Sequence, residues 1–390
     1  MTAAALSAAV PAGSRNAAAL HVDATLADRS LDLSIDLEAG HTLAVLGANG
    51  AGKSSLLNIL AGLLRPDTGH ATLADRTLFD LGDARPARWL PPHRRGVSLL
   101  AQQPLLFPHL TGLDNVAFGP RSAGQSRRQS RAAAVHWLEE VDALHLADRK
   151  PAQLSGGQSQ RIAVARALAS DPALLLLDEP LAALDVAVAQ DVRRMLRRVL
   201  AARTVVVVTH DILDALTLAD RVVVIRDGVI VEQGPTRQVL QRPRTRFTAE
   251  LAGLNLLTGR GTATGLQLDD GTVITGSAVP DGSESVPGSE AVPNGSESMA
   301  EGSESMVGRA AAVAVSPSAV SVSIEVPPAG TPNVVRATIR DLDPHGDLVR
   351  VRSDVLAADV LPEVVVDLDL AAGTPVYFTF APAVATLYAV

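Results

Sequence analysis

Short apolar segments alternate with amphipathic ones between His21 and about Thr245. The second and third of the candidate strands listed below are almost continuously apolar, which is typical of strands covered on both faces of a parallel sheet. This alternation predicts an α/β domain with a mainly parallel sheet. The candidate strands are Thr42–Leu46, Ala173–Leu177, Thr204–Val208 and Arg221–Ile225.

Two patterns add detail to this domain. Apolar residues recur at helical spacing between Val188 and Leu200, while four arginines take the opposite side, which indicates a solvated helix face. Farther along, Asp227-Gly228 lies between two apolar runs and predicts a hairpin that closes the sheet of the domain. The four arginines are Arg193, Arg194, Arg197 and Arg198.

After about Phe247 the pattern changes to short Val-rich runs separated by Gly, Asp and Pro, which predicts a small all-β domain. Gly-Ser-Glu recurs within Ser277–Gly308, where no aromatic or basic residue occurs. We expect this insert to be disordered, with a flexible acidic tether as the open alternative. The expected division is a mobile extension at 1–18, an α/β domain at 19–245, and a β domain at 246–390 interrupted at 277–308. Its candidate strands are Val320–Val326, Asn333–Ile339 and Leu348–Val351.

Composition narrows the possible functions. The chain has no cysteine, which excludes disulfides and thiol chemistry, and no apolar run approaches the roughly 18 residues that cross a bilayer. The stretch from Leu256 to Val390 holds 17 acidic residues against six arginines and no lysine. Aromatic residues are only 3%, so neither part of the chain has the basic, aromatic surface expected of a nucleic-acid partner.

The strongest chemical motif is the segment Gly47–Ser54, which follows the strand Thr42–Leu46 and precedes an apolar helix. It fits the P-loop pattern, in which glycines let backbone amides point at phosphates. Lys53, one of only two lysines in the chain, is predicted to reach the β- and γ-phosphates, and Ser54 to bind Mg²⁺. The predicted nucleotide contacts here are Gly47, Asn49, Gly50, Gly52, Lys53, Ser54 and Ser55.

A second motif is the carboxylate pair Asp178-Glu179, which ends the apolar strand Ala173–Leu177. Side chains alternate along an extended chain, so the two carboxylates point in different directions. Asp178 is therefore predicted to hold Mg²⁺ and Glu179 to activate the attacking water.

With these motifs in place, the chain resembles the ATP-binding-cassette (ABC) ATPases, a family of α/β P-loop proteins. Leu154–Gln158 is similar to the family signature, followed in order by family elements at Asp185 and His210, with Gln102 upstream. The resemblance implies a head-to-tail homodimer that binds ATP and Mg²⁺. The implied catalytic residues are Glu179, His210 and Lys53; the implied nucleotide contacts add Gln102, Ser155, Gly156, Gly157, Gln158, Asp178 and Asp185; the implied metal ligands are Ser54, Gln102 and Asp178.

One departure concerns the base of the nucleotide. Family members usually stack adenine on an aromatic residue before the P-loop, yet no Phe, Trp or Tyr precedes Phe79 here. Leu26 and His21 are both candidates for this contact, and the sequence does not assign it to either.

Within the family, Gln102–Thr111 resembles importer ATPases, and the β domain resembles their regulatory oligonucleotide-fold modules. Trp89–Gly96 is most similar to the molybdate subfamily. The resemblance implies membrane permease partners, an indirect solute-binding protein, and a peripheral position at the cytoplasmic face of the cell membrane. Alternatives are importers of sulfate, iron, polyamine or sugar, an exporter ATPase, a soluble DNA-repair ATPase, and an inactive binding protein.

Overall fold

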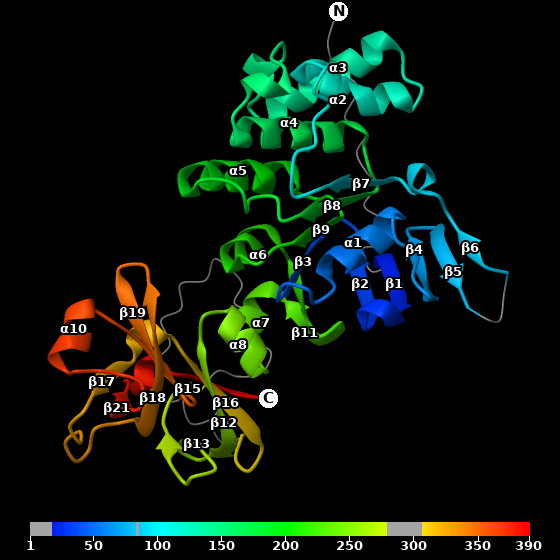
Figure 1. The fold of residues 1–390 in the computed structure, drawn as a ribbon. Helices are drawn as coiled ribbons and strands as arrows, with labels where there is room; N and C mark the ends of the chain where they lie inside the picture. Colours follow the sequence, from blue (N-terminus) through cyan, green and yellow to red (C-terminus); the bar gives the residue numbers. More distant parts are fainter. Residues whose placement is uncertain (1–17, 83–85, 279–305) are drawn as a thin grey trace, which may run out of the picture. The chain divides into compact units, whose positions relative to one another are not determined.

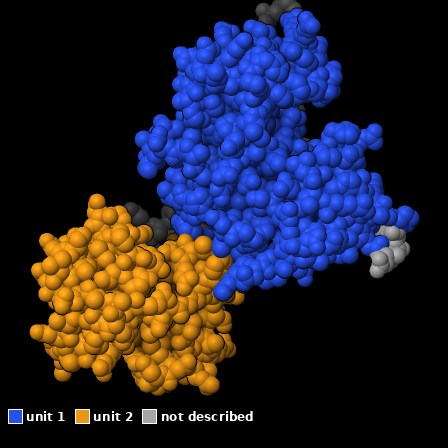
Figure 2. All heavy atoms as spheres, viewed as in Figure 1, with its two compact units in different colours: residues 1–236 blue, residues 237–390 orange. Residues whose placement is uncertain are grey.

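Two compact units divide the chain after Thr236, and Figure 2 colours them separately. The computed structural model describes residues 18–82, 86–278 and 306–390, so the predicted mobile extension at 1–18 lies outside the described residues except for Ala18, which begins a strand. The short helix α7 (Thr236–Gln241) falls almost wholly in the second unit, although the sequence placed the boundary at 245. None of the helices in the described ranges is long and apolar enough to span a membrane.

The first unit is built on one eleven-stranded sheet with the order β6-β5-β4-β1-β2-β11-β10-β3-β9-β8-β7. Strands β10, β3, β9, β8 and β7 are parallel to their neighbours in that part of the sheet, as predicted. β8 and β9 lie inside the sheet, and their apolar residues are buried on both faces. The strands are β1 (Ala18–Leu26), β2 (Leu31–Glu38), β3 (Thr42–Gly47), β4 (Thr68–Leu73), β5 (Arg76–Leu81), β6 (Arg88–Trp89), β7 (Val97–Leu100), β8 (Leu174–Asp178), β9 (Val205–Val208), β10 (Arg221–Arg226) and β11 (Val229–Pro235).

The predicted hairpin forms, with Asp227 and Gly228 at φ 51° and 81° between β10 and β11. The expectation that it closes the sheet is wrong, because β11 also pairs with β2. The hairpin therefore joins the parallel half of the sheet to the antiparallel half. The sequence pattern shows local pairing but does not show which neighbour a strand finds on its other edge.

The helices of the first unit cover this sheet and form a separate helical group. α2, α3 and α4 pack together, as Figure 1 shows, while α1 lies against β3, β7, β8 and β9. Side-chain caps mark several starts: Thr111 accepts from the amide of Asp114, and Ser126 forms a capping box with Gln129. The helices are α1 (Lys53–Ala61), α2 (Gly112–Ser122), α3 (Arg127–Glu140), α4 (Gly156–Ala169), α5 (Val186–Val199) and α6 (Ile212–Leu218).

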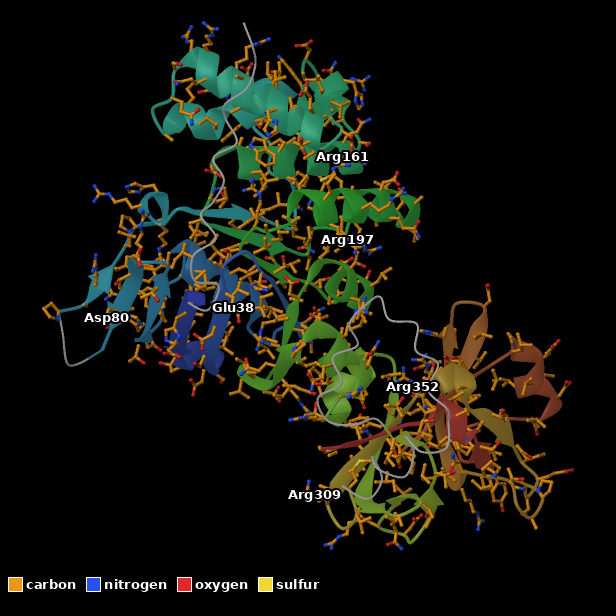
Figure 3. All side chains as sticks on the ribbon, turned by 180° about the vertical axis from the view of Figure 1, so that it is seen from behind. Glu38, Asp80, Arg161, Arg197, Arg309 and Arg352 are labelled. Atoms are coloured by element: carbon orange, nitrogen blue, oxygen red, sulfur yellow. The ribbon has the colours of Figure 1, made fainter. Side chains whose placement is uncertain are left out.

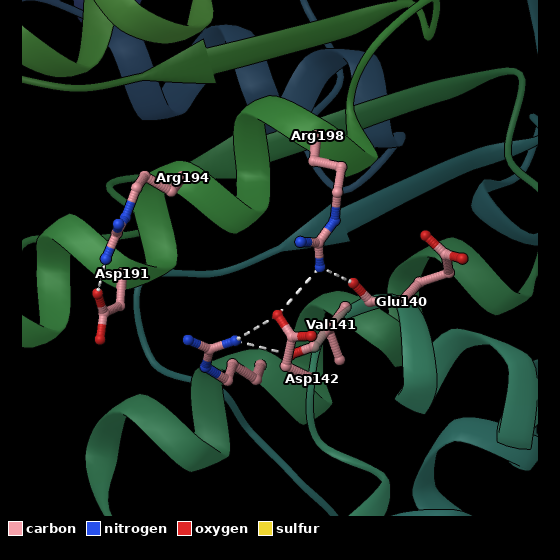
Figure 4. Close-up of polar contacts among 7 residues, drawn as sticks. Glu140, Val141, Asp142, Asp191, Arg194 and Arg198 are labelled. Carbon is pink, nitrogen blue, oxygen red and sulfur yellow. Dashed lines mark hydrogen bonds and ion pairs between the residues drawn. The ribbon is translucent and has the colours of Figure 1, made fainter.

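The arginines of α5 are only partly the solvated face predicted for them. Arg194 and Arg197 are exposed (Arg197 is labelled in Figure 3), and Arg194 pairs with Asp191 one turn before. Arg198 is exposed too, but it also reaches the carbonyl of Glu140, the last residue of α3, and the carboxylate of Asp142 just after it (Figure 4). Arg193 corrects the prediction outright, because it is buried between carboxylates of the α6 region that helical spacing does not reveal.

The second unit contains two sheets, of order β14-β13-β12-β16-β22-β15 and β17-β21-β18-β19-β20, as a small all-β domain requires. Its core is formed by side chains of both sheets, including Val313, Ile339, Val351 and Phe378. The elements are α8 (Arg246–Leu251), β12 (Asn255–Thr262), β13 (Gly265–Gln267), β14 (Val273–Ile274), β15 (Ser277–Ala278), β16 (Ala310–Val315), β17 (Ser321–Ser323), β18 (Val334–His345), β19 (Leu348–Ser353), β20 (Ala357–Val360), α10 (Pro362–Asp367), β21 (Pro375–Thr379) and β22 (Thr386–Ala389).

The ends of the predicted disordered insert belong to this unit. Ser277 and Ala278 pair with β22, and Met306 is buried in the hydrophobic core. The expectation of disorder is wrong for these ends, since a composition argument cannot see strand pairing supplied by distant residues. Residues 279–305, the rest of the insert, lie outside the described residues.

Candidate active site

The loop between β3 and α1 presents backbone amides rather than side chains. Gly52 precedes α1 in the left-handed region, with φ 100°, and no side chain caps the start of this helix. This conformation favours glycine, and a Cβ on Gly52 would also lie 2.4 Å from Cδ1 of Leu31, so that the leucine side chain would have to shift. The first-turn amides of α1 and the positive end of its dipole therefore face a site for an anion.

Lys53 is the first residue of α1 and is almost fully buried. Its Nζ donates to the carbonyl oxygens of Gly47 and Ala48, each at 2.8 Å, which folds the side chain back over the loop. Burial lowers the pKa of Lys53, and the charges of Glu179 and Asp178 oppose that shift. The ammonium group is therefore held against the carbonyl oxygens at the start of the loop.

The carboxylate pair lies across from this loop. Burial raises the pKa of Asp178, and the charge of Glu179 adds to that rise, while the hydroxyl of Ser54 and the charge of Lys53 lower it. Glu179 leaves β8 with φ 45°, an uncommon conformation for a residue with a side chain, and its amide donates to the carbonyl of Val208. This backbone turn directs the two neighbouring carboxylates differently.

Glu179 brings together two more of the predicted residues. Nε2 of Gln102 donates to Oε2 of Glu179 at 3.2 Å, and Nδ1 of His210 lies 3.5 Å from Oε1. Gln102 follows β7 and His210 follows β9, the two strands on either side of β8. The carboxyl ends of parallel strands meet at one sheet edge, so the strand order itself assembles these three side chains.

The loop and Glu179 line one pocket of about 360 Å³. Asn49, Gly50, Lys53, Ser54 and Ser55 all line it, as expected from the P-loop pattern. The pocket also contains a residue that the sequence did not single out, Arg29. The complete lining is Arg29, Asn49, Gly50, Gly52, Lys53, Ser54, Ser55 and Glu179.

The signature segment does not line this pocket. Ser155 instead caps α4 in a reciprocal capping box, accepting from the amide of Gln158 and donating its own amide to the Gln158 side chain. Ser155 and Gly156 are exposed, and so is Asp185, which precedes α5. Within one chain the second Gly-Ser cluster is therefore separate from the first.

Two arginines are buried, which the sequence did not predict, and each bonds an element next to the site. Arg95 donates to the carbonyl oxygens of Ile59 and Leu60 at the end of α1, and burial lowers its pKa to about 10. Arg193 bonds Asp214 at 2.7 Å and Asp211 at 2.9 Å, on either side of the start of α6 and next to His210. Only the three-dimensional structure reveals these roles, because both arginines lie in basic runs that read as surface.

Residues 31–182 match the family description "ABC transporter". The chain is 44% identical over 375 residues to the molybdenum import ATP-binding protein of Mycobacterium tuberculosis (strain H37Rv), covering 92% of this chain and 94% of that protein. The chain belongs to the ABC transporter family. It is an ATP-binding transport ATPase of that family. The P-loop pocket and the contacts of Glu179 with Gln102 and His210 are consistent with this activity.

Other relatives match a smaller part of the chain. An Fe(3+) ions import ATP-binding protein of Rhizobium meliloti (strain 1021) is 40% identical over 224 residues, which cover 57% of this chain and 61% of that protein. Among solved structures, cbiO1 from Clostridium perfringens aligns with a TM-score of 0.51 and 25% identity, covering 58% of this chain and 91% of that one.

Proposed function

We propose that this protein is the ATP-hydrolysing subunit of an importer for a tetrahedral oxyanion, molybdate. The observation that carries the substrate is how far each similarity extends along the chain. The similarity to the molybdenum import protein covers 92% of the chain and so includes most of the second unit, whereas the Fe(3+) import protein matches 57%. The first unit is common to importers of many solutes, and the second unit is what this chain shares with the molybdenum protein.

The pocket fits ATP with Mg²⁺. The amides of the loop and the ammonium group of Lys53 are suited to binding the phosphates. The hydroxyl of Ser54 forms a hydrogen bond with Asp178, so a hydroxyl and a carboxylate lie side by side, and Mg²⁺ prefers such oxygen ligands. Gln102 is the third proposed ligand, its amide lying beside Glu179. Bound Mg²⁺ would neutralise phosphate charge, and Ser54, Asp178 and Gln102 would hold it.

Hydrolysis is assigned to Glu179, which accepts a proton from the attacking water. His210 and Gln102 both contact its carboxylate and so fix its orientation beside the γ-phosphate. Lys53 stabilises the charge that develops on the phosphoryl oxygens. The two carboxylates have different partners, since Glu179 contacts Gln102 and His210 whereas Asp178 is bonded by Ser54, which supports separate roles for base and metal ligand.

A second chain is proposed to complete each site. Ser155, Gly156, Gly157 and Gln158 lie outside the pocket of their own chain, and the start of α4 is exposed. A head-to-tail homodimer would bring this segment and Asp185 over the ATP of its partner. The dimer would act on permease subunits at the cytoplasmic face of the membrane, served indirectly by a solute-binding protein.

Uptake in cells that lack the chain tests the substrate. We expect molybdate accumulation at limiting external concentration to be lost, restored by the wild-type chain, and not restored by Lys53→Ala. Sulfate and iron uptake, measured in the same cells, should be unchanged. Normal molybdate uptake together with loss of sulfate or iron uptake would overturn the substrate and leave the ATPase assignment intact.

A further inference from the structure

The pocket contains no aromatic side chain among its described lining residues. Neither candidate from the sequence reaches it. Leu26 is buried in the hydrophobic core, and both ring nitrogens of His21 are engaged, by Asp36 at 2.7 Å and by Asp23 at 2.8 Å. The wall that would meet the base of a nucleotide must therefore come from another residue.

Arg29 lines the same pocket and is the residue to which we assign this contact. It ends the 3₁₀ turn Ala27–Arg29, which connects β1 to β2 and is fixed on both sides. The amide of Ala27 donates to Asp67 at 2.8 Å, and the side chain of Leu31, at the start of β2, lies against Gly52. The turn is therefore tied to Asp67 on one side, and the strand that follows it packs on the phosphate-binding loop.

Two neighbouring serines show what surrounds Arg29 in the pocket. The hydroxyl of Ser54 forms a hydrogen bond with Asp178, whereas Oγ of Ser55 accepts a hydrogen bond from Nη1 of Arg29 at 2.7 Å. Consecutive residues on a helix point about 100° apart, so the two hydroxyls define different sides of the start of α1. Arg29 therefore contacts a different side of the start of α1 from Asp178, and this is the side on which we place the nucleoside.

Arg29 is exposed to solvent. The described residues place an arginine guanidinium over an aromatic ring at Arg95, Arg166 and Arg203, and Arg29 has no such contact. The bond to Ser55 engages Nη1 of Arg29 and ties the group to the start of α1. Guanidinium planes stack on nucleobases.

We propose that Arg29 supplies the base-stacking surface of the nucleotide site, with its guanidinium plane against the purine ring of ATP. This inference rests on the proposed nucleotide site and adds the contact that recognises the base. Lys53 and the loop amides already meet the phosphates, so Arg29 acts on the nucleoside end.

Replacements at Arg29 separate its plane from its charge in the full-length chain. Arg29→Lys keeps the charge without the plane, Arg29→Tyr keeps a plane without the charge, and Arg29→Ala removes both. We expect Ala and Lys to weaken binding of ATP by about 5- to 30-fold, with Tyr close to wild type. Inorganic tripolyphosphate, which has no base, should bind all four proteins equally. Arg65→Ala, an exposed arginine beyond the other end of α1, is the matched control.

The outcomes are distinct. If Arg29→Ala weakens tripolyphosphate as much as ATP, or if Lys restores ATP binding and Tyr does not, Arg29 is a phosphate ligand and the stacking proposal is overturned. Unchanged ATP affinity in all three variants overturns it as well. Wild-type protein that binds neither ATP nor tripolyphosphate would instead refute the nucleotide site itself. Lys53→Ala is the control for loss of phosphate binding, since it should weaken the binding of both ATP and tripolyphosphate.

Discussion

Helices α1 and α4 of the first unit both start next to Gly and Ser residues, but their first backbone amides find different partners. Every helix start leaves amides without partners inside the helix. α4 satisfies two of them internally through the capping box of Ser155 and Gln158, whereas α1 follows Gly52 with no side-chain cap. The start of α1 therefore leaves its amides for a ligand, while the start of α4 is capped by its own side chains, and we propose that it meets the ATP of a partner chain.

The largest difference between the two starts should be chemical, because only the start of α1 faces a carboxylate pair. Glu179→Gln removes the proposed base while keeping the size of the side chain, so ATP turnover should fall by about 10²- to 10⁴-fold with ATP still bound. Phosphate release and equilibrium nucleotide binding measure the two effects. Glu139→Gln, on the exposed face of α3, is the control and should behave as wild type. Near-normal turnover in Glu179→Gln would remove it as the base.

The second prediction compares glycine replacements at the two starts. Gly52→Ala forces a side chain into φ 100° and against Leu31, and should lower the free energy of unfolding by about 1–3 kcal/mol. Gly156→Ala meets Leu184 at an ordinary 3.7 Å and gains helix propensity, so stability should stay the same or rise slightly. Thermal melting of the two variants provides the comparison. Equal destabilisation would show that the two starts are under the same constraint.

Much of the α1 start was predictable and the rest was not, for physical reasons. The phosphate loop, the carboxylate pair and the strands before them are local patterns, because each needs particular residue types at fixed spacing. Arg29, Arg95 and Arg193 act on partners 18 to 36 residues away in the sequence. Such contacts depend on strand order, and a basic side chain in a polar run gives no sign of them.

The same distinction explains the errors in the predicted fold. Asp227-Gly228 predicts a hairpin because the turn is local, yet the second edge of β11 pairs with β2, whose residues are far earlier. Low hydrophobicity likewise predicts disorder for Ser277 and Ala278, which β22 recruits into its sheet. Local chemistry defines elements, whereas their neighbours follow from the whole chain.

The third prediction separates the two roles of Ser155. Ser155→Ala should cost about 1 kcal/mol of stability through the lost cap. Ser155→Asp keeps a capping oxygen and should restore the melting temperature, yet its charge would repel the phosphates of ATP held by a partner chain. ATP turnover should therefore fall in both variants, while stability falls in only one. Turnover that follows stability in both would leave the cap as the whole function of Ser155.

The smallest expected effect concerns how the region before α4 is joined to α5. Asp142 has its pKa lowered chiefly by the hydrogen bond from Arg198, with Arg161 contributing, so its ionised form stabilises the folded chain. The stabilisation is present above the ordinary aspartate pKa of about 4 and is lost as the pH falls through the lowered folded value.

Because Asp142 is largely exposed, Asp142→Asn should cost only a few tenths of a kcal/mol, and at most about 1. Urea unfolding at pH 5–7 should show this difference, which should shrink below about pH 4 and in 1 M salt. Arg194→Ala, which breaks a pair within α5 alone, is the control and should not alter the effect of Asp142→Asn. A difference that persists unchanged in acid and salt would mean that Asp142 stabilises the junction through its shape or hydrogen bonding, and that charge plays no part in joining these elements.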